Sequence, residues 1–565
     1  MAAWKGTTTD SDVLLVGAGP AGLATALQAH AHGASVRVVD RRQHRIRPSR
    51  AMMMHARALE GLRPLGVTDE LLNRADTTPE ARIHVGRRVV EARLGRADLP
   101  DTAFPHLTLV RQADVEDVLW QALQARGVGV DWGVRFHGLH RDKPVASGPG
   151  LVHAELHRAD GGREQHRSRF LAGCDGQSST VRGLIGARWR GGPYGVDAVM
   201  ADLELDGPLD PGLLHVAVGS AGLVFLFALG EGAAWRMLAT RPAVPPPGAR
   251  FGQLGPAVPG EEVVGLVHNS GLGAVVRRVR WSAQVPLQHR IASTFGNDPV
   301  FLAGDAAHAH SPAGGQGMNN GILDALNLGW KLGFASTAGR PLPELLGSYG
   351  QERRPAARRV LALTHVIFFG EASPYPVARL ARSILPVLAP ALPLVLRQRW
   401  LTSKGIRLLA QPFVHYRGSP LSCDATPRAA GWPRPGERLP DAPAAVGGRP
   451  TRLHDLTAAP GIHLFLERDA GPATLGAGPT VPVTEGQAPL QGQLLHVHRL
   501  TSHPGRGVVA VRPDGYVGFR CGDADAGQLH HWLRLVGAAR GPEAGAGGNP
   551  LRRDAPSVMA PKTVL

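Results

Sequence analysis

Residues 12–22 read DVLLVGAGPAG, and this stretch decides the fold of the first part of the chain. The apolar run over residues 12–16 predicts a buried strand. The Gly-x-Gly-x-x-Gly that follows predicts a tight turn into a helix over residues 23–31. A second apolar run, residues 35–39, ends at Asp40. Strand, glycine turn, helix and second strand together predict a βαβ unit of a doubly wound α/β sheet.

The turn residues have mechanical roles. Gly17 permits the sharp turn, Gly19 lets the backbone approach a pyrophosphate, and Gly22 lets the helix pack closely on the strand. Asp40 is placed to accept hydrogen bonds from an adenosine ribose. A lone glycine motif is a weak signal, but the complete unit predicts dinucleotide binding.

A second glycine-rich segment, residues 301–321, reads FLAGDAAHAHSPAGGQGMNNG. Residues 300–303 predict a short strand that leads to Gly304 and Asp305, and a helix is predicted to start near Met318. The carboxylate can accept hydrogen bonds from sugar hydroxyls, and free N–H groups at a helix start face negative charge. A polyol chain attached to an anionic ring, as in reduced flavin, fits both features.

A third segment, residues 170–182 (FLAGCDGQSSTVR), again joins an apolar strand to an acid and a glycine, Asp175 and Gly176. Alone it reads equally well as an ordinary turn.

Together, in this order, the three segments resemble the dinucleotide, Asp-Gly and Gly-Asp fingerprints of single-component flavoprotein monooxygenases of the p-hydroxybenzoate hydroxylase type. The resemblance covers most of residues 10–360, and residues 508–520 (VVAVRPDGYVGFR) resemble the C-terminal thioredoxin-like domain of phenol hydroxylases and polyketide-tailoring hydroxylases. Further segments typical of the family are residues 50–60, 109–119 (LVRQADVEDVL), 322–332 (ILDALNLGWKL) and 349–355 (YGQERRP).

The resemblance implies non-covalently bound FAD, with NADPH or NADH as co-substrate. It implies hydroxylation of a phenolic ring, including polycyclic polyketides, by O2 through a flavin C4a-hydroperoxide. The chain has no second Gly-x-Gly-x-x-Gly, as expected for a family in which the nicotinamide has no Rossmann domain of its own, so the choice between NADPH and NADH stays open.

The motifs and the resemblance predict a set of site residues. The loop over the flavin is expected to act through Pro312, Gly317, Met318 and Asn319. The expected FAD contacts are Gly17, Gly19, Pro20, Ala21, Gly22, Asp40, Arg41, Arg50, Gln112, Asp175, Gly304, Asp305, Pro312, Gly315, Gly317, Met318 and Asn319. Arg50 competes with Arg41 and other arginines of the same loop, and we expect His308 and His310 to support the 301–321 loop.

Substrate residues are expected from a strand-rich region over residues 186–285, whose sheet would cover the flavin. Alternate residues of a strand face one side. The candidates chosen on this basis are His215, Phe225, Phe227, Trp235 and Met237, and ordinary core positions are the alternative.

The expected architecture is α/β with a discontinuous FAD-binding Rossmann-like domain, an inserted β-sheet substrate domain and a C-terminal thioredoxin-like domain. The expected divisions are residues 1–75, 105–185 and 286–340 for FAD; 76–104, 186–285 and 341–425 for the substrate domain and helical region; 426–450 for a Pro- and Gly-rich linker; 451–541 for the C-terminal domain; and 542–565 for a disordered tail.

The composition of the chain limits which other partners and sites we expect. Net charge is +16, but the arginines are scattered and aromatic content is 5%, so we expect no nucleic-acid partner. The cysteines, Cys174, Cys423 and Cys521, form no Cys-x-x-Cys, and we expect no metal site and a cytoplasmic location. Residues 384–396 are apolar but too short to span a bilayer, so they predict a buried or interfacial helix. Monomer and homodimer both stay open.

Rival functions remain. A flavin-dependent halogenase normally carries Gly-x-Trp-x-Trp-x-Ile-Pro and a catalytic lysine, and the sequence has neither. An epoxidase would use residues 384–396 as an anchor. A Baeyer–Villiger or antibiotic-inactivating oxygenase, or a non-catalytic flavin-binding protein, is the third alternative.

Overall fold

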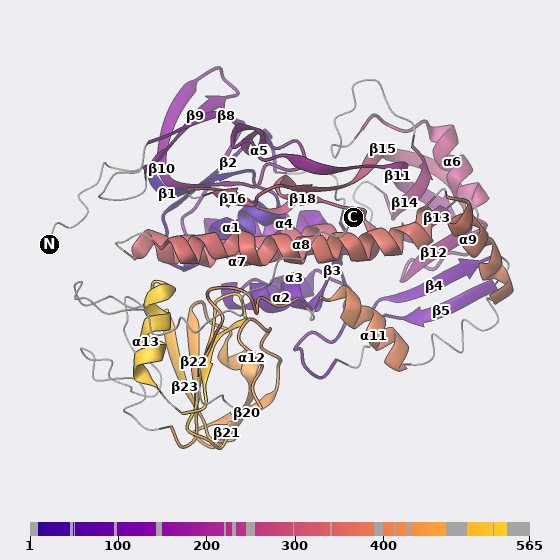
Figure 1. Ribbon diagram of the computed structural model, residues 1–565. Coiled ribbons are helices and arrows are strands. Elements are labelled where there is room, and N and C mark those ends of the chain that lie inside the picture. The colour runs from indigo at the N-terminus through magenta and orange to yellow at the C-terminus, as the bar shows by residue number, and fades with distance from the viewer. Residues whose placement is uncertain are drawn as a thin grey trace, which may run out of the picture.

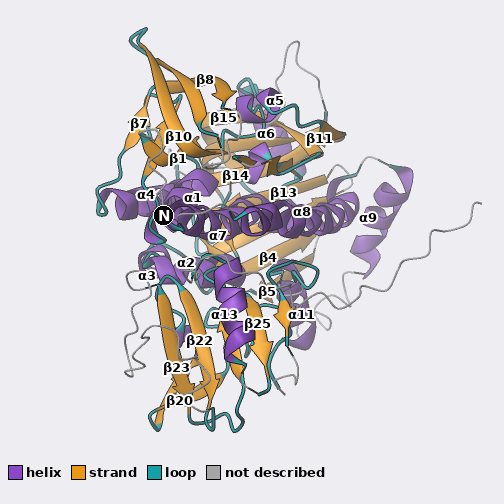
Figure 2. Cartoon of the chain, turned by 60° about the vertical axis from the view of Figure 1, so that its left-hand side comes forward, coloured by secondary structure: helices purple, strands orange, loops and turns teal. Residues whose placement is uncertain are grey.

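The computed structural model describes residues 10–45, 49, 51–86, 88–94, 99–142, 150–219, 222–228, 233–243, 255–297, 299–338, 342–373, 375–388, 399–411, 414–425, 431–470, 494–523 and 525–538. Two sheets lie above and beside a pair of long central helices, and a third sheet lies below them (Figure 1). When the molecule is turned, the strands β20 (Pro443–Val446), β22 (Ile462–Glu467) and β23 (Leu495–Leu500) of the third sheet again lie below the central helices (Figure 2).

The first sheet is the predicted doubly wound sheet, and its central strands are parallel. Its main path is β16 (Gly296–Asn297), β17 (Val300–Leu302), β10 (Arg163–Gly173), β1 (Ser11–Val16), β2 (Val36–Asp40) and β7 (Val130–Trp132). A hairpin of β8 (Val134–Arg141) and β9 (Val152–Arg158) continues from β10. The helices packed around it include α1 (Pro20–Ala31), α4 (Gln112–Gln124), α5 (Thr180–Leu184) and α7 (Gln316–Thr337). Both strands and the helix of the predicted βαβ unit are therefore confirmed.

The second sheet covers the carboxyl-end loops of the first. Its order is β18 (His308–Ala309), β15 (Val275–Ala292), β11 (Trp189–Asp206), β14 (Trp235–Pro242), β13 (Gly222–Phe227), β12 (Leu213–Gly219), β4 (Glu80–Val85) and β5 (Arg88–Arg93). Helix α6 (Gly260–Asn269) packs on one face of this sheet. Strand β18 belongs to the 301–321 loop and pairs with β15, so the loop joins the two sheets.

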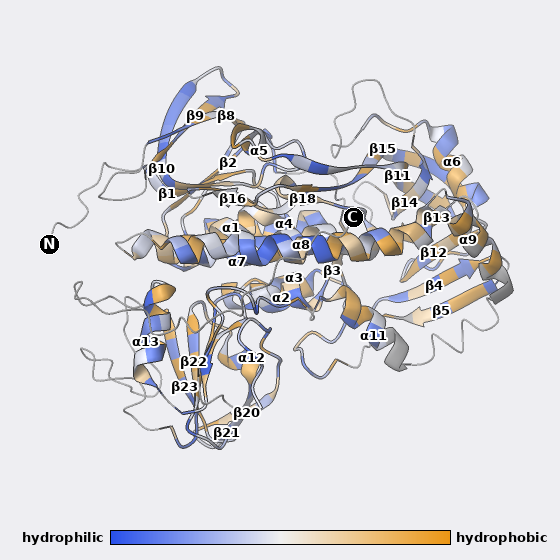
Figure 3. Cartoon of the chain, in the orientation of Figure 1, coloured by the Kyte–Doolittle hydropathy of each residue, from blue (hydrophilic) through white to orange (hydrophobic). Residues whose placement is uncertain are grey.

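Helices and short elements fill the space between the sheets. The long helices α7 and α8 (Pro343–Ala372) cross the middle of the molecule, and α8 has both hydrophilic and hydrophobic turns (Figure 3). The smaller elements are β3 (Met53–Met54), α2 (Ala56–Leu62), η1 (Arg63–Leu65), α3 (Thr68–Asn73), β6 (Thr108–Leu109), η2 (Gly304–Ala306), η3 (Ala313–Gly315), α9 (Pro376–Leu388) and α11 (Arg399–Leu409). Among the described residues no helix is both long and apolar enough to cross a membrane. The apolar run 384–396 is helical up to Leu388, and the rest lies outside the described residues.

The C-terminal domain is a mixed sheet with one long helix. Its order is β19 (Cys423–Asp424), β25 (Val517–Cys521), β24 (Val508–Val511), β22 (Ile462–Glu467), β23 (Leu495–Leu500), β20 (Pro443–Val446) and β21 (Arg449–Arg452), with α12 (Leu453–Leu456) and α13 (Ala526–Leu535). β22 and β23 are parallel and β24 and β25 antiparallel, as a thioredoxin-like fold requires.

The expected linker over residues 426–450 needs a correction. Strands β20 and β21 lie partly within it and pair with each other, and β20 pairs with β23. The sheet therefore begins before residue 451, because prolines at edge positions do not prevent strand pairing there. Residues 426–430 and the predicted tail 542–565 lie outside the described residues.

The C-terminal domain shares its core with α7. Trp330 and Phe334 of α7 pack among Ile462, Phe519 and Trp532.

A buried ionic cluster lies beside this core. Arg512 contacts both carboxylate oxygens of Glu352 at 2.7 and 2.8 Å and Asp514 at 2.6 Å. Lys331 donates to Glu352 at 2.7 Å and to Asn327 at 2.8 Å. The C-terminal domain is thus joined to the helix whose other end begins at the 301–321 loop.

Candidate active site

A cavity of about 360 Å³ lies between the first and second sheets. It is lined at one end by the glycine turns and at the other by the inner face of the second sheet. Of the predicted FAD contacts, those that line it are Gly17, Gly19, Pro20, Ala21, Asp40, Arg41, Gln112, Asp175, Gly304, Asp305, Pro312, Gly315, Gly317 and Met318. Arg50 lies outside the described residues.

The first glycine turn is held by backbone packing. Gly17 has φ +105°, and a Cβ there would lie 2.4 Å from the carbonyl oxygen of Cys174. A Cβ on Gly22 would lie 1.9 Å from the Gly17 oxygen, so Gly22 packs the turn and does not line the cavity. Helix α1 begins after Gly19 with Pro20 in its first turn and no side-chain cap. Its free N–H groups can therefore bind an anion.

The Asp40 carboxylate already accepts hydrogen bonds from within the protein. It accepts them from the Ala18 N–H at 2.7 Å and from Arg42 Nε at 3.1 Å. Burial raises the pKa of Asp40, but Arg42 outweighs that effect and the net pKa is lowered. A role in ribose binding stays a prediction, and Arg42 is a supporting residue that sequence analysis did not single out.

Asp175 lies in the cavity wall and is held by the start of α5. Oδ2 accepts from the N–H groups of Thr180 at 2.7 Å and Val181 at 3.2 Å. Burial raises the pKa of this carboxyl group. A contact of Asp175 with the pyrophosphate of a bound dinucleotide stays a prediction.

The 301–321 loop ends in two left-handed glycines. Gly314 and Gly315 have φ of +66° and +64°, and Gly315 caps α7 without a side-chain hydrogen bond. Gly317 is helical, and a Cβ there would meet only the His310 ring, at 3.9 Å. Glycine at 317 is thus not needed for backbone conformation; it leaves open space in the cavity, beside the start of α7.

Asn319 supports this loop without lining the cavity. Its Oδ1 accepts from the His55 N–H at 2.8 Å, and its Nδ2 donates to the oxygens of Met53 at 3.0 Å and Gly315 at 2.7 Å. His55 Nε2 lies 2.8 Å from the Gly314 oxygen, and burial lowers the pKa of His55 to about 4. Asn319 was predicted as a direct contact, and the structure makes it a positioning residue.

A buried charge network fixes the other side of the loop. Asp324 accepts from His308 Nε2 at 2.7 Å, the Gly304 N–H at 3.0 Å and Arg353 Nε at 2.7 Å. The predicted supporting role of His308 agrees with this contact. Asp324 and Arg353 lie in family segments quoted above but received no role. Asp324 could have been found as a charge within an otherwise apolar helical pattern. Arg353 lies in a polar, charged segment and gives no such signal.

His310 lies in the same loop, and its supporting role stays a prediction. Its ring lines the cavity, and its Nδ1 lies 2.9 Å from the Ser311 oxygen, so Nδ1 carries the proton and donates. Nε2 is buried and has no hydrogen-bond partner among the described residues. Burial, and then the charge of His308, lower the pKa of His310 to about 4. The ring is therefore neutral near pH 7.

The substrate end of the cavity corrects the predicted strand face. Its lining includes Ala198, Met200, Phe227, Arg236, Leu238, Val285, Leu287 and Gln288. Of the five candidates only Phe227 is among them. Phe225 shares the face of Phe227 and stacks on it at 6.2 Å, outside the lining.

Trp235, Met237 and His215 do not line the cavity, and we no longer assign them to substrate. Trp235 and Met237 face α6 in a separate core, and His215 packs against Trp235. The alternation of side chains along β14 was predicted correctly, but the face that lines the cavity was not. Helix α6 packs against the face that carries the larger side chains.

Arg236 is the charged residue at this end and is 1% exposed, and Gln288 is a second polar residue of the lining. Arg236 Nη2 lies 2.9 Å from Asp202 Oδ2, and the guanidinium also donates to the Ser49 oxygen. The charge is neutralised within the wall, so the substrate end is apolar in net character.

Two family models match the chain: an FAD-binding domain over residues 10–364 and the C-terminal domain of aromatic-ring hydroxylases over residues 432–539. The 6-methylpretetramide 4-monooxygenase of Streptomyces rimosus is 32% identical over 528 residues, covering 89% of this chain and 90% of that protein. The rifampicin monooxygenase of Streptomyces venezuelae is 32% identical over 380 residues, 66% of this chain and 75% of that protein. The solved structure of OxyS anhydrotetracycline hydroxylase from Streptomyces rimosus matches with a TM-score of 0.70 at 25% identity, covering 94% of this chain and 100% of that one.

The chain belongs to the FAD-dependent aromatic-ring hydroxylase family. It is a flavin-dependent monooxygenase, and the cavity fits FAD on its own features: the starts of α1 and α7, which have no side-chain cap, and the space at Gly317. When bound, FAD supplies the redox chemistry that activates O2. The protein holds the cofactor and shields it from water.

Proposed function

We propose that this monooxygenase hydroxylates a polycyclic phenolic substrate, with NADPH or NADH as electron donor. The observation that carries the proposal is the single cavity that joins the dinucleotide turn to an apolar wall on the second sheet. Met200, Leu238 and Leu287 of that wall offer a flat ring system apolar contact. Two of the relatives that match over nearly the full length are named for polycyclic substrates, which supports this class over a single-ring phenol.

The function is tested with purified protein, both nicotinamide cofactors and a panel of polycyclic phenols. The expected result is substrate-stimulated NAD(P)H oxidation with incorporation of one atom from isotopically labelled O2 into the product. Oxidation that yields only hydrogen peroxide for every phenol, or a brominated product when bromide is added, would contradict the proposal.

A further inference from the structure

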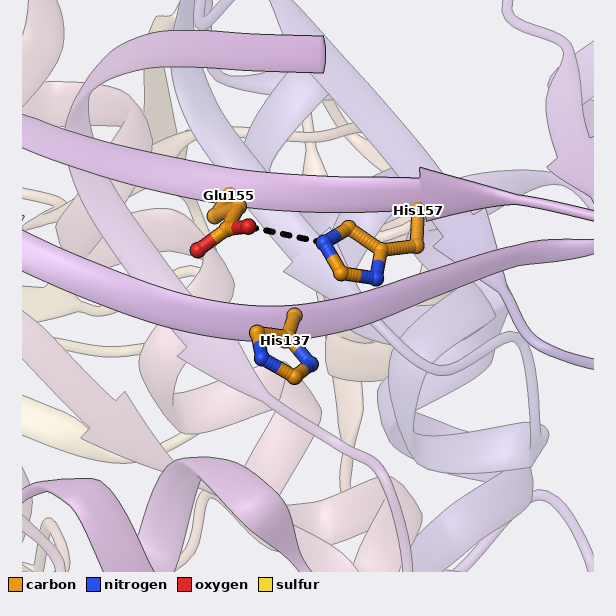
Figure 4. A group of neighbouring side chains, drawn as sticks. All are labelled: His137, Glu155 and His157. Atoms are coloured by element: carbon orange, nitrogen blue, oxygen red, sulfur yellow. Dashed lines mark hydrogen bonds and ion pairs between the residues drawn. The ribbon is translucent and has the colours of Figure 1, made fainter. Parts of the chain in front are cut away.

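The outer face of the β8–β9 hairpin carries three metal-ligand side chains that the monooxygenase site does not use (Figure 4). One ligand atom each of His137, Glu155 and His157 lies within 4.8 Å of the others. The two imidazole rings stack with centroids 4.3 Å apart, and His157 Nε2 lies 2.7 Å from Glu155 Oε1.

The strand register explains why these side chains meet. Phe136 pairs with Leu156 and Gly138 with Glu155, so His137 is the additional residue of a bulge. Phe136 and Leu156 point into the core, where they are 4% and 0% exposed. Glu155 and His157 flank Leu156 on β9 and therefore share the opposite face. His137 comes from β8 to meet them there (Figure 4).

We propose that His137, Glu155 and His157 bind one divalent transition-metal ion of the zinc class, with a remaining coordination position open to water. Two imidazoles and one carboxylate form a ligand set that zinc accepts and that magnesium, which prefers oxygen ligands, does not. The carboxylate offsets part of the ion's charge. Arg163, which pairs with His157 in the register, opposes binding through its positive charge.

The site lies behind the cavity wall and outside the cavity. Val134, Arg135 and Phe136 line the cavity, and the next residue along β8 is His137, on the other face. A bound ion would connect β8 to β9 and brace that wall without touching the substrate. Sequence analysis expected no metal site because the cysteines form no pair. The three ligands proposed here come from two strands, and only Glu155-x-His157 is local in the sequence.

The test uses the full-length, tag-free holoenzyme titrated with ZnCl₂ and, separately, with MgCl₂ by isothermal calorimetry. We expect one Zn²⁺ per chain and no Mg²⁺ at the same concentrations. His137→Ala and Glu155→Gln should each weaken Zn²⁺ binding by at least about tenfold. The FAD absorbance of each variant reports that the protein is folded.

His153→Ala is the matched control, since His153 lies on the same hairpin but is bonded to Asp142. It should leave Zn²⁺ affinity unchanged. With Cu²⁺ as a spectroscopic probe, electron paramagnetic resonance should show two nitrogen ligands in the wild type and one in His137→Ala. Absence of Zn²⁺ binding, binding that survives both ligand variants, or equal weakening by His153→Ala would overturn the assignment.

Discussion

The walls at the two ends of the cavity are formed by different parts of the chain. At the cofactor end the wall is mostly backbone: glycines in turns, uncapped helix starts, and side chains such as Asp175 whose hydrogen bonds are largely to main-chain N–H groups. At the substrate end the wall is side chains on a sheet, with the buried Arg236–Asp202 pair as its polar part. Backbone geometry cannot be varied without moving strands, whereas strand side chains can be exchanged one at a time. The chemistry is therefore fixed at one end and the substrate range can change at the other.

The largest expected effect tests the backbone end. Gly17→Val adds a side chain at φ +105° and 2.4 Å from the Cys174 oxygen, so the turn between β1 and α1 must move. Strain of this kind costs roughly 1–3 kcal/mol before the clash is counted. We expect purified Gly17→Val to contain little or no FAD by absorbance. Gly183→Ala is the control, since its Cβ meets nothing. Normal FAD content in Gly17→Val would show that the turn is not rigid.

A smaller effect is expected at Gly317, which also lies at the cofactor end of the cavity but has open space where a side chain would be added. Gly317→Val has no backbone clash and fills cavity volume beside the His310 ring. The fold should survive, while FAD affinity falls by roughly tenfold, about 1.4 kcal/mol, and more NAD(P)H is consumed per product. Gly317→Ala should lie between wild type and Gly317→Val. Fluorescence titration of FAD and product per NAD(P)H are the measurements; wild-type values for both would remove this residue from the site.

Met237 and Leu238 are neighbours on β14 at the substrate end. Met237 faces the core beneath α6, and Leu238 faces the cavity. Met237→Ala empties a fully buried position against α6 and should lower the free energy of unfolding by about 2–5 kcal/mol. Leu238→Ala enlarges the cavity and should raise KM by a few fold, with a smaller loss of stability. Urea unfolding and steady-state kinetics distinguish them. The reverse pattern would mean that the cavity face of this strand has been misassigned.

The smallest expected effect concerns acid. Burial lowers the pKa of His55 to about 4, so between pH 6.5 and about 4 this residue is protonated in the unfolded chain and neutral in the folded protein. Stability is thus full above pH 6.5 and falls as the pH falls toward 4. His55→Gln should reduce the loss between pH 7 and pH 5 by about 1–2 kcal/mol. Because His55 holds Gly314, FAD release on acidification should also be altered, and an unchanged pH profile of unfolding would contradict this account.

The same contrast explains what the sequence could predict. Features formed by the backbone require glycine at fixed spacings. The roles of Gly17, Gly22 and Gly315 could therefore be predicted from the sequence. The choice between the two faces of β14 depends on where α6 packs, and nothing local to Trp235 or Arg236 encodes that. Asp324 and Arg353 were quoted within family segments, but their pairing joins α7 to α8 and is a tertiary contact.

The cluster of Lys331, Glu352, Arg512 and Asp514 has a consequence for exchanging parts between relatives. Two of its charges belong to the central helices and two to the C-terminal domain. Replacing that domain with one lacking Arg512 would remove one of the two cations that contact Glu352 among the described residues, and breaking such a buried pair costs roughly 3–5 kcal/mol. A chimaera should therefore inherit the four residues as a set, so the domain boundary useful to an engineer runs through α7 and α8 and not through the segment that connects the domains.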